Sequence, residues 1–344
     1  MRIAHFSDLH LGARGSTVPR AAALLDRAIE EGAEHLLIGG DVVDHGNLDD
    51  AERLLEAFAR RGFEGPEKIT AVPGNHDIWP AGEENLTRHL ANWAAEELRA
   101  LLSGDDHVAQ QRYLKFQRLF PVESPGATAM TTGDAYPAVK EIGPAMVGLF
   151  DTTANRALRH SEGRFPEAEA DWTFRQMKQW RGPRILLMHH WPFEWAVWDI
   201  DAELQDLSTF KRLALRALLI AAQRDEADLR NVFDVNFRRL EEVQAALESS
   251  PLDLVLCGHL HMHGSVRAKA FDRKLGDVRV CCMGRSGGIH QGADVEHAFH
   301  LIDVGPKSVT VKTVYVERKA LAAQRRESQG TRHRAASRPR RLLS

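Results

Sequence analysis

The chain has 344 residues, of which 43% are apolar and 27% are charged, and its formal net charge is −3. No run approaches the roughly 18 uninterrupted apolar residues of a membrane span, so the composition predicts a soluble globular protein without a transmembrane helix. The first residues, MRIAHFSD, begin a strand-like pattern and not a signal peptide, and we therefore expect a cytoplasmic protein.

Short apolar runs predict β-strands, and helical patterns separate the first of them. The predicted strands are, in chain order, residues 2–8, 34–41, 68–75, 145–152, 184–190, 252–259, 278–284, 299–305 and 309–317. Helical patterns at 18–31 and 49–61 produce the alternation of βαβ units, whereas the last strands follow one another directly. The first half of the chain is therefore predicted to be α/β.

Two long stretches, at about 78–137 and 193–250, do not fit this alternation and are predicted to be largely helical. We interpret them as insertions in one domain that spans residues 1–317, and the second is long enough to form a lid over a site. Trp191, Phe193, Trp195 and Trp198 lie at its start. These aromatic side chains could stack on a base, but core anchoring is the favoured interpretation.

The last residues, 318–344, contain nine Arg or Lys and one Glu, a balance of +8 that leaves −11 for residues 1–317. A basic tail with few large apolar side chains cannot build a core, so we predict that it is disordered. Its charge would suit nucleic acid or an anionic membrane surface, and a solvated tail without a partner is the alternative.

The three cysteines, Cys257, Cys281 and Cys282, lie in apolar strand-like runs. An odd and sparse count does not make a disulfide framework, so we predict buried thiols. Because Cys281 and Cys282 are adjacent in a strand, their side chains should point to opposite faces of a sheet.

Most of the early strands end in Asp, His or Asn. Ligands of open α/β sheets lie outside the carboxyl ends of the strands, so residues that are distant in sequence could converge there. In chain order the motifs are Asp8-Leu9-His10, Gly40-Asp41-Val42-Val43-Asp44, Gly74-Asn75-His76-Asp77, His189-His190 and Gly258-His259-Leu260-His261. Carboxylate, imidazole and amide ligands suit Mn, Fe or Zn, and a carboxylate can bridge two ions.

In this order, the motifs resemble those of the calcineurin-like metallophosphoesterase superfamily, whose signature runs DXH, GDXXD, GNH(D/E), a lone H and GHXH. The resemblance covers roughly residues 1–305. It implies an α/β fold, an α+β sandwich in which two packed mixed β-sheets are flanked by helices in four layers. It also implies two divalent metal ions per chain, Mn, Fe or Zn, bound at one edge of the sandwich.

The resemblance assigns a role to each motif residue. It implies that Asp8, His10 and His261 hold one metal, that Asn75, His189 and His259 hold the other, and that Asp41 bridges them. His189 is preferred over His190 as the ligand, although Trp191 separates this pair from the proline that usually follows it in relatives.

The remaining motif residues would act around the metals. The resemblance makes His76 a catalytic residue that faces the leaving-group oxygen, with Asp44 holding its far nitrogen. Asp77 and Asp151 are weaker candidates for supporting roles. His263 has no place in the motif, and we expect it to be solvated or to support a ligand.

The opening HFSDLHLG resembles class III cyclic nucleotide phosphodiesterases and recombination and repair nucleases about equally. GNHD and the histidine pair before a proline favour the diesterases, whereas lipid A pathway hydrolases typically carry GNRD. The predicted reaction is hydrolysis of a phosphodiester by a hydroxide that bridges the two metals, with 3′,5′-cyclic nucleotides as candidate substrates. A DNA repair-type nuclease, a phosphomonoesterase and a non-catalytic scaffold are the alternatives. The oligomeric state is left open, a dimer included.

Overall fold

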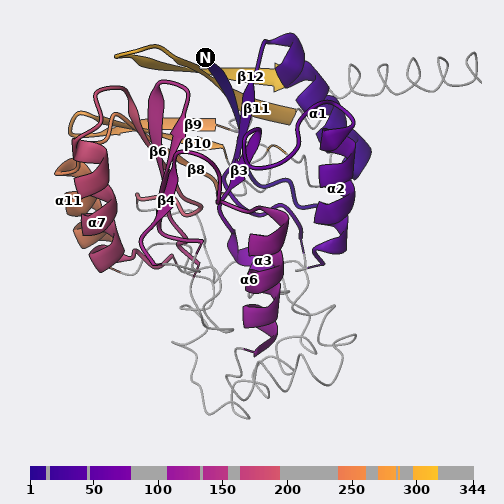
Figure 1. Cartoon of the computed structure of the whole chain (residues 1–344), viewed down its shortest axis with the longest axis horizontal. Coiled ribbons are helices and arrows are strands. Elements are labelled where there is room, and N and C mark those ends of the chain that lie inside the picture. The colour runs from indigo at the N-terminus through magenta and orange to yellow at the C-terminus, as the bar shows by residue number, and fades with distance from the viewer. Residues whose placement is uncertain are drawn as a thin grey trace, which may run out of the picture.

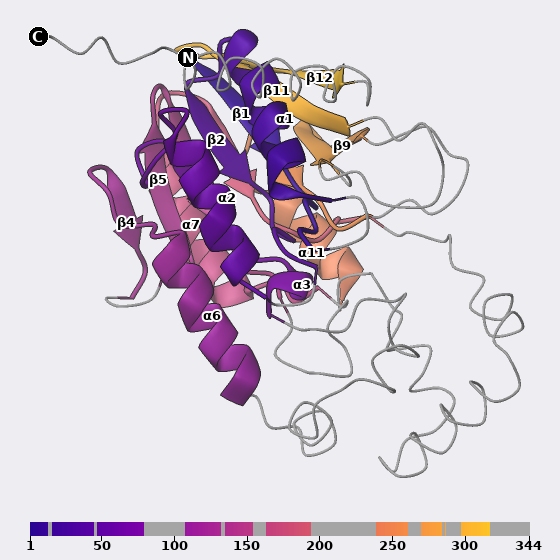
Figure 2. The same ribbon diagram turned by 90° about the vertical axis from the view of Figure 1, so that its right-hand side faces the viewer.

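A computed structural model shows two β-sheets packed face to face, with helices on both outer faces (Figures 1 and 2). The structure describes residues 1–12, 16–44, 47–78, 107–131, 135–153, 163–193, 239–260, 270–283, 286 and 297–316. The four layers confirm the predicted fold class of two mixed sheets flanked by helices. None of the described helices combines the length and apolarity needed to cross a membrane.

The first sheet has the strand order β12-β11-β1-β2-β3. Its strands are β1 (Arg2–Phe6), β2 (His35–Ile38), β3 (Ile69–Ala71), β11 (His297–Val304) and β12 (Val309–Val316). β1, β2 and β3 are parallel, whereas β11 pairs antiparallel with both β1 and β12. The connecting helices α1 (Val18–Glu30) and α2 (Asp49–Ala59) cover the outer face (Figure 1).

The second sheet has the strand order β4-β5-β6-β7-β8-β10-β9. Its strands are β4 (Ala127–Ala129), β5 (Ala138–Ile142), β6 (Ala145–Leu149), β7 (Arg184–Leu187), β8 (Leu254–Cys257), β9 (Ala270–Leu275) and β10 (Val278–Met283). The neighbours β6, β7, β8 and β10 are parallel. Helices α7 (Glu167–Lys178) and α11 (Leu240–Glu248) cover its outer face (Figure 1).

Two further helices lie at the edge where the parallel strands end. The short α3 (Asn75–Ile78) follows β3, and α6 (His107–Leu119) packs beside it (Figures 1 and 2). α6 and α11 fall within the two predicted insertions, and β4 also lies in the first of them. The rest of both insertions and the basic tail lie outside the described residues, so their predicted roles stay predictions.

All nine predicted strands and both predicted helices are present. Three strands and two helices among the described residues were not predicted, namely β4, β5, β9, the short α3 and α7. The sequence AFDRKL of β9 places charged residues on exposed positions of an edge strand, and α7 is strongly polar, so neither β9 nor α7 carries an apolar signal. Tertiary pairing, and not local hydrophobicity, decides these elements.

The core between the sheets explains the continuous apolar runs. Ile3 and Leu37 of the first sheet pack against a cluster that includes Ile185 of the second sheet, while alternate residues such as Phe6 face the outer helices. Parallel strands that are buried on both faces need apolar residues at every position. The cysteines follow the same rule, because Cys281 lies between the sheets and Cys282 lies in the cluster under α11, which confirms their opposite faces.

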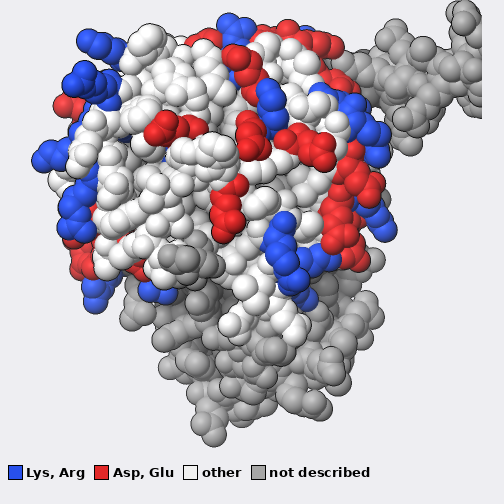
Figure 3. Space-filling view, in the orientation of Figure 1, with Lys and Arg blue, Asp and Glu red and all other residues white. Residues whose placement is uncertain are grey.

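The described part of the face in Figure 3 carries acidic and basic side chains that are interspersed with apolar and neutral ones. On this described face we observe no continuous basic stripe of the kind that tracks a nucleic-acid backbone.

Candidate dinuclear metal centre

The motif residues converge where five strands end. Asp8 follows β1, Asp41 follows β2, Asn75 begins α3 after β3, His189 follows β7 and His259 follows β8. All five side chains are buried, with at most 6% of each residue exposed. The parallel order within each sheet brings these ends to one edge, as the resemblance implied. His261 and His263 lie outside the described residues, so their roles stay predictions.

The backbone at this edge is strained. Asp8, His10, Asp41 and His259 have φ values of 54°, 45°, 52° and 75°, in the left-handed region that non-glycine residues rarely adopt. Such conformations cost on the order of 1–3 kcal/mol each and cluster at functional sites. Gly40, at φ 91°, permits the tight turn, because a Cβ there would lie 2.6 Å from His189 Nδ1.

The first group of donor atoms surrounds one point. His189 Nε2 lies 3.1 Å from Asn75 Oδ1, 3.2 Å from His259 Nδ1 and 3.3 Å from Asp41 Oδ2, and His259 Nδ1 lies 3.1 Å from Asn75 Oδ1. Metal–ligand bonds of about 2.0–2.1 Å separate neighbouring ligand atoms by roughly 3.0 Å in an octahedron and roughly 3.4 Å in a tetrahedron. The observed spacings fall in this range.

Hydrogen bonding decides which atom of His189 faces the group. Its Nδ1 lies 2.7 Å from the carbonyl oxygen of Gly39 and donates a hydrogen bond to it, which leaves Nε2 turned toward Asp41 and Asn75. Burial lowers the pKa of His189, but the Asp41 carboxylate raises it to about 9. One proton on Nε2 can satisfy only one of the surrounding acceptors, whereas a metal ion would satisfy them together.

The second group centres on His10. Its Nε2 lies 3.7 Å from Asp8 Oδ1 and 3.5 Å from Asp41 Oδ2, while its Nδ1 lies 3.1 Å from Asp44 Oδ1. Burial lowers the pKa of His10, and hydrogen bonds with Asp44 and Asp8 raise it to about 10. A carboxylate behind a histidine orients the ring and makes it a better metal ligand. His10 is therefore held with Nε2 toward the two aspartates.

Asp41 belongs to both groups. Potential ligand atoms of His10, Asp41 and His76 lie within 4.8 Å of one another, and so do those of Asp41, His189 and His259. The Oδ1 atom of Asp41 accepts a hydrogen bond from the His76 amide at 2.9 Å, while Oδ2 lies near His10 and His189. One shared carboxylate between two imidazole groups is the arrangement that two neighbouring cations require.

Asp8 is held by two partners. The Ser7 hydroxyl lies 2.6 Å from Asp8 Oδ2, and the His259 amide donates to both carboxylate oxygens at 3.0 and 3.1 Å. The Ser7 backbone in turn exchanges hydrogen bonds with Ser286. We did not predict Ser7 or Ser286. Ser7 could have been noticed from its place directly before the DXH motif, but no sequence pattern marks Ser286.

The contact between Asp44 and His76 differs from the predicted one. His76 Nδ1 lies 2.9 Å from the backbone carbonyl of Asp44 and 3.7 Å from its carboxylate, which instead contacts His10 at 3.1 Å. The sharp turn after β2 explains the difference, because it directs the Asp44 carbonyl toward α3 and leaves the side chain beside His10. His10 and His76 pack edge to face, with ring centroids 4.7 Å apart.

The side chains of His189 and His190 point to opposite sides of the chain, as expected of adjacent residues in an extended segment. His189 joins the donor group, whereas His190 Nδ1 lies 2.8 Å from Thr152 Oγ1 and its ring stacks on His259 with centroids 4.3 Å apart. Trp191 is 1% exposed and lies in the core beneath α7 and α11, as the core-anchor interpretation expects. Trp195 and Trp198 lie outside the described residues.

Of the two weaker candidates, Asp77 supports the site. Its oxygens accept hydrogen bonds from the Val43 and Gly74 amides at 3.0 and 2.9 Å, which ties the loop after β2 to the loop after β3. Burial raises the pKa of Asp77 to about 7, and the Asp41 charge adds to this effect. Asp151 instead bonds to Thr153, and no hydrogen bond to a candidate metal ligand is observed for it among the described residues.

Comparisons with known proteins agree with this geometry. The calcineurin-like phosphoesterase family matches residues 1–263, which is most of the chain. No curated protein sequence matches significantly.

Three of the solved structures that are similar to this chain carry different descriptions. A dimetal phosphatase from Danio rerio is 11% identical, with a TM-score of 0.46, and the match covers 92% of this chain and 98% of that one. A 5′-nucleotidase precursor from Thermus thermophilus is 15% identical, with a TM-score of 0.44 and coverage of 93% and 55%. Vps29 from Entamoeba histolytica, a single mutant, is 13% identical, with a TM-score of 0.34 and coverage of 92% and 99%.

These structural scores are all below 0.5, so the assignment rests on the family match together with the motifs that the fold brings to one edge. The chain belongs to the calcineurin-like phosphoesterase family.

Proposed function

We propose that the protein is a dinuclear metal-dependent phosphodiesterase. The observation that carries the proposal is the pair of donor groups that share Asp41, since two cations held by one shared carboxylate would be able to act on one phosphoryl group. Mn, Fe or Zn would suit the mixture of imidazole, carboxylate and amide ligands.

The described residues divide into two ligand sets. Asp8 and His10 would hold one ion, together with His261, and Asn75, His189 and His259 would hold the other. Bound there, a pair of divalent ions supplies Lewis acidity for a phosphoryl displacement. Hydrogen bonds behind the ligands keep them in place without the ions.

His76 would serve the leaving group. Its Nδ1 faces the Asp44 carbonyl, which only accepts, so Nδ1 carries a hydrogen and Nε2 is the atom that gains and loses a proton. A protonated Nε2 could donate to the departing oxygen as negative charge develops there. The Asp44 carboxylate, 3.7 Å away, favours the protonated ring. Because His76 also lies within reach of His10 and Asp41, the experiment must separate this role from metal binding.

Diesters are the proposed substrates because GNHD and the histidine pair before a proline favour the diesterase branch of the family. Cyclic nucleotides remain the first candidates. A nuclease or phosphomonoesterase would use the same centre, so the substrate panel below must separate these activities. A non-catalytic scaffold would be expected to lose ligands, whereas every candidate ligand among the described residues is present and oriented.

The test begins with metal-free protein and the Asp41→Asn variant. We expect wild type to bind two ions per chain and to hydrolyse aryl diesters faster than aryl monoesters, and we expect Asp41→Asn to lose at least one ion and most activity. Asp277→Asn, an exposed aspartate in the turn between β9 and β10, is the matched control and should keep both. Full activity without bound transition metal would contradict the dinuclear proposal, and faster monoester turnover would contradict the choice of diesters. Cyclic nucleotides, single-stranded DNA and phospholipid-derived diesters complete the substrate panel.

A further inference from the structure

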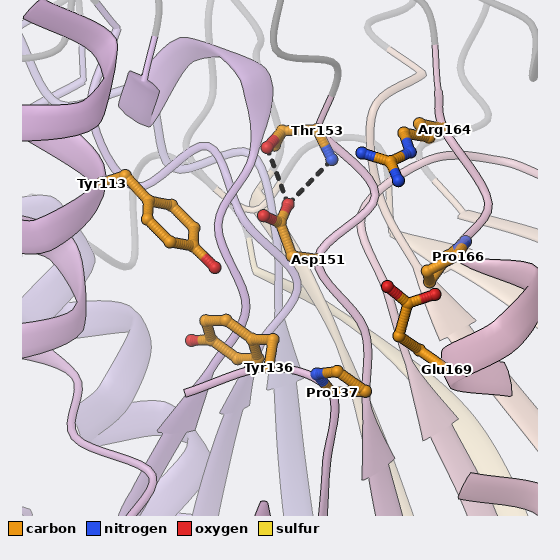
Figure 4. Close-up of a pocket in the computed structure, with 8 residues that line it drawn as sticks. All are labelled: Tyr113, Tyr136, Pro137, Asp151, Thr153, Arg164, Pro166 and Glu169. Carbon is orange, nitrogen blue, oxygen red and sulfur yellow. Dashed lines mark hydrogen bonds between the residues drawn. The ribbon is translucent and has the colours of Figure 1, made fainter. Parts of the chain in front are cut away.

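A pocket with a volume of about 110 Å³ opens around Asp151 and Thr153, which follow β6 (Figure 4). The residues that give it its chemical character are Tyr113, Tyr136, Asp151, Thr153, Arg164 and Glu169. The pocket is far smaller than the roughly 300–1,000 Å³ of a site for a drug-sized ligand, so it suits a single planar ring or a small polar group.

The chain that follows β6 connects this pocket to the metal centre. Thr152 contacts His190, whose ring stacks on the candidate ligand His259, while its neighbours Asp151 and Thr153 line the pocket. This alternation is the one expected of extended chain. Since β6 and β7 are parallel neighbours, the pocket and the metal centre lie at the same edge of the second sheet.

A carboxylate lies at the centre of the pocket wall. Asp151 Oδ1 accepts hydrogen bonds from the Thr153 amide at 2.8 Å and from the Thr153 hydroxyl at 2.7 Å, which fixes its orientation (Figure 4). Burial raises the pKa of Asp151, while hydrogen bonds from Thr153 and Tyr113 and the positive charge of Arg164 oppose the rise. A half-buried, oriented carboxylate that still faces the pocket is well matched by a ligand that presents N–H donors.

The wall opposite Tyr113 and Tyr136 carries one basic and one acidic side chain, Arg164 and Glu169 (Figure 4). Within the described part of the chain, the side chains of Arg164 and Glu169 form no ion pair with one another or with other residues. Arg164 therefore offers N–H donors to the pocket, and Glu169 offers a second acceptor (Figure 4). The rings of Tyr113 and Tyr136 form the remaining wall, and the Tyr136 hydroxyl is anchored to the Ala71 carbonyl at 2.7 Å.

These groups discriminate between ligand classes. A simple ammonium would be attracted by Asp151 and Glu169 but repelled by Arg164. A simple anion would be attracted by Arg164 but repelled by the two carboxylates. A nucleobase presents donors and acceptors on one rigid ring that can pack against tyrosine. Guanine combines an amino donor with the O6 and N7 acceptors that arginine pairs with, so it complements a carboxylate and a guanidinium together.

We infer that this pocket binds the nucleobase of a nucleotide-type diester, with guanine as the preferred base, Asp151 accepting from its N–H donors and Arg164 donating to its acceptors. The inference rests on the proposed function for the identity of the reacting group, but the base site itself can be tested without turnover.

The first experiment is calorimetric titration of the full-length, metal-loaded protein with guanosine, adenosine and uridine, none of which carries a phosphate. Guanosine should bind most tightly. Asp151→Asn and Arg164→Gln should each weaken guanosine binding about 5- to 150-fold, the range that one good polar pair to a base supplies. Arg175→Gln, an exposed arginine on α7, is the matched control and should leave binding unchanged.

The second experiment compares hydrolysis of the p-nitrophenyl ester of guanosine 5′-phosphate with that of methyl p-nitrophenyl phosphate, which has no base. The two pocket variants should lower kcat/KM for the first ester and leave it unchanged for the second. If Asp151→Asn does not fold, the Arg164→Gln variant alone tests the pocket, because Arg164 is exposed and its replacement should not affect folding.

Equal binding of the three nucleosides, or guanosine binding that neither variant weakens, would overturn the inference. The outcomes also separate the two proposals. If guanosine binds but the methyl ester is not hydrolysed, the proposed function fails alone. If the methyl ester is hydrolysed but the base has no effect, the pocket inference fails alone.

Discussion

Gly258 leaves no room for a side chain, which makes Gly258→Ala a direct test of how Asp8 is held. A Cβ at this position would overlap Ser7 Oγ and Asp8 Oδ2 and would lie 2.8 Å from Ser7 Cβ. If the new methyl group pushes Asp8 away, the hydrogen bonds that Asp8 accepts from the Ser7 hydroxyl and the His259 amide are broken. Hydrogen bonds to a charged group contribute about 1.5–3 kcal/mol each. We therefore expect the free energy of unfolding to fall by about 3–6 kcal/mol and metal binding to weaken.

The assay combines urea unfolding with metal analysis of the same preparations. Gly305→Ala is the matched control, because its Cβ would meet Ser308 Oγ at 2.8 Å, and a serine hydroxyl can rotate away. That variant should unfold within about 1 kcal/mol of wild type, as is usual for surface substitutions. If Gly258→Ala keeps two ions per chain and wild-type stability, Asp8 is not held between Ser7 and His259 as the structure shows.

Three further predictions concern catalysis, acid stability and the tail. His76→Asn should keep both metals and slow the hydrolysis of an alkyl diester by roughly 10²–10⁴-fold but that of an aryl diester much less. Steady-state rates on matched alkyl and aryl esters test this, and loss of metal would show that His76 is a ligand. Burial lowers the pKa of His300 to about 3. The neutral ring therefore contributes its full stability above about pH 6.5, and this contribution is lost as the pH falls toward 3. Between these pH values, the plot of unfolding free energy against pH should be shallower in His300→Gln than in wild type by about 1.4 kcal/mol per pH unit. An unchanged slope would show that His300 is not held neutral in the folded protein. Deleting residues 320–344 should leave turnover of a small aryl diester unchanged, and abolished turnover would show that the tail reaches the site.

The positions of the main strands could be predicted because the information is local. A run such as LVLC in β8 is apolar at every position since both of its faces are covered, and the candidate ligand His259 follows after Gly258, where the strand leaves the core. Parallel strands then bring their ends to one edge, so the candidate ligands could be proposed before their geometry was known. The short edge strand β9 was not predicted, because its exposed charged residues leave no alternation of apolar and polar positions.

The sequence by itself thus determined which strands form, where their polar ends lie and which residue types gather there. Only the tertiary structure decided that the Asp44 carboxylate supports His10 and not His76, that His189 turns inward while His190 bonds to Thr152, and that Asp151 faces a separate pocket. Each of these depends on how segments far apart in the chain approach one another. Such contacts are set by sheet pairing and by the direction of individual turns, which leave no periodic signal in the sequence.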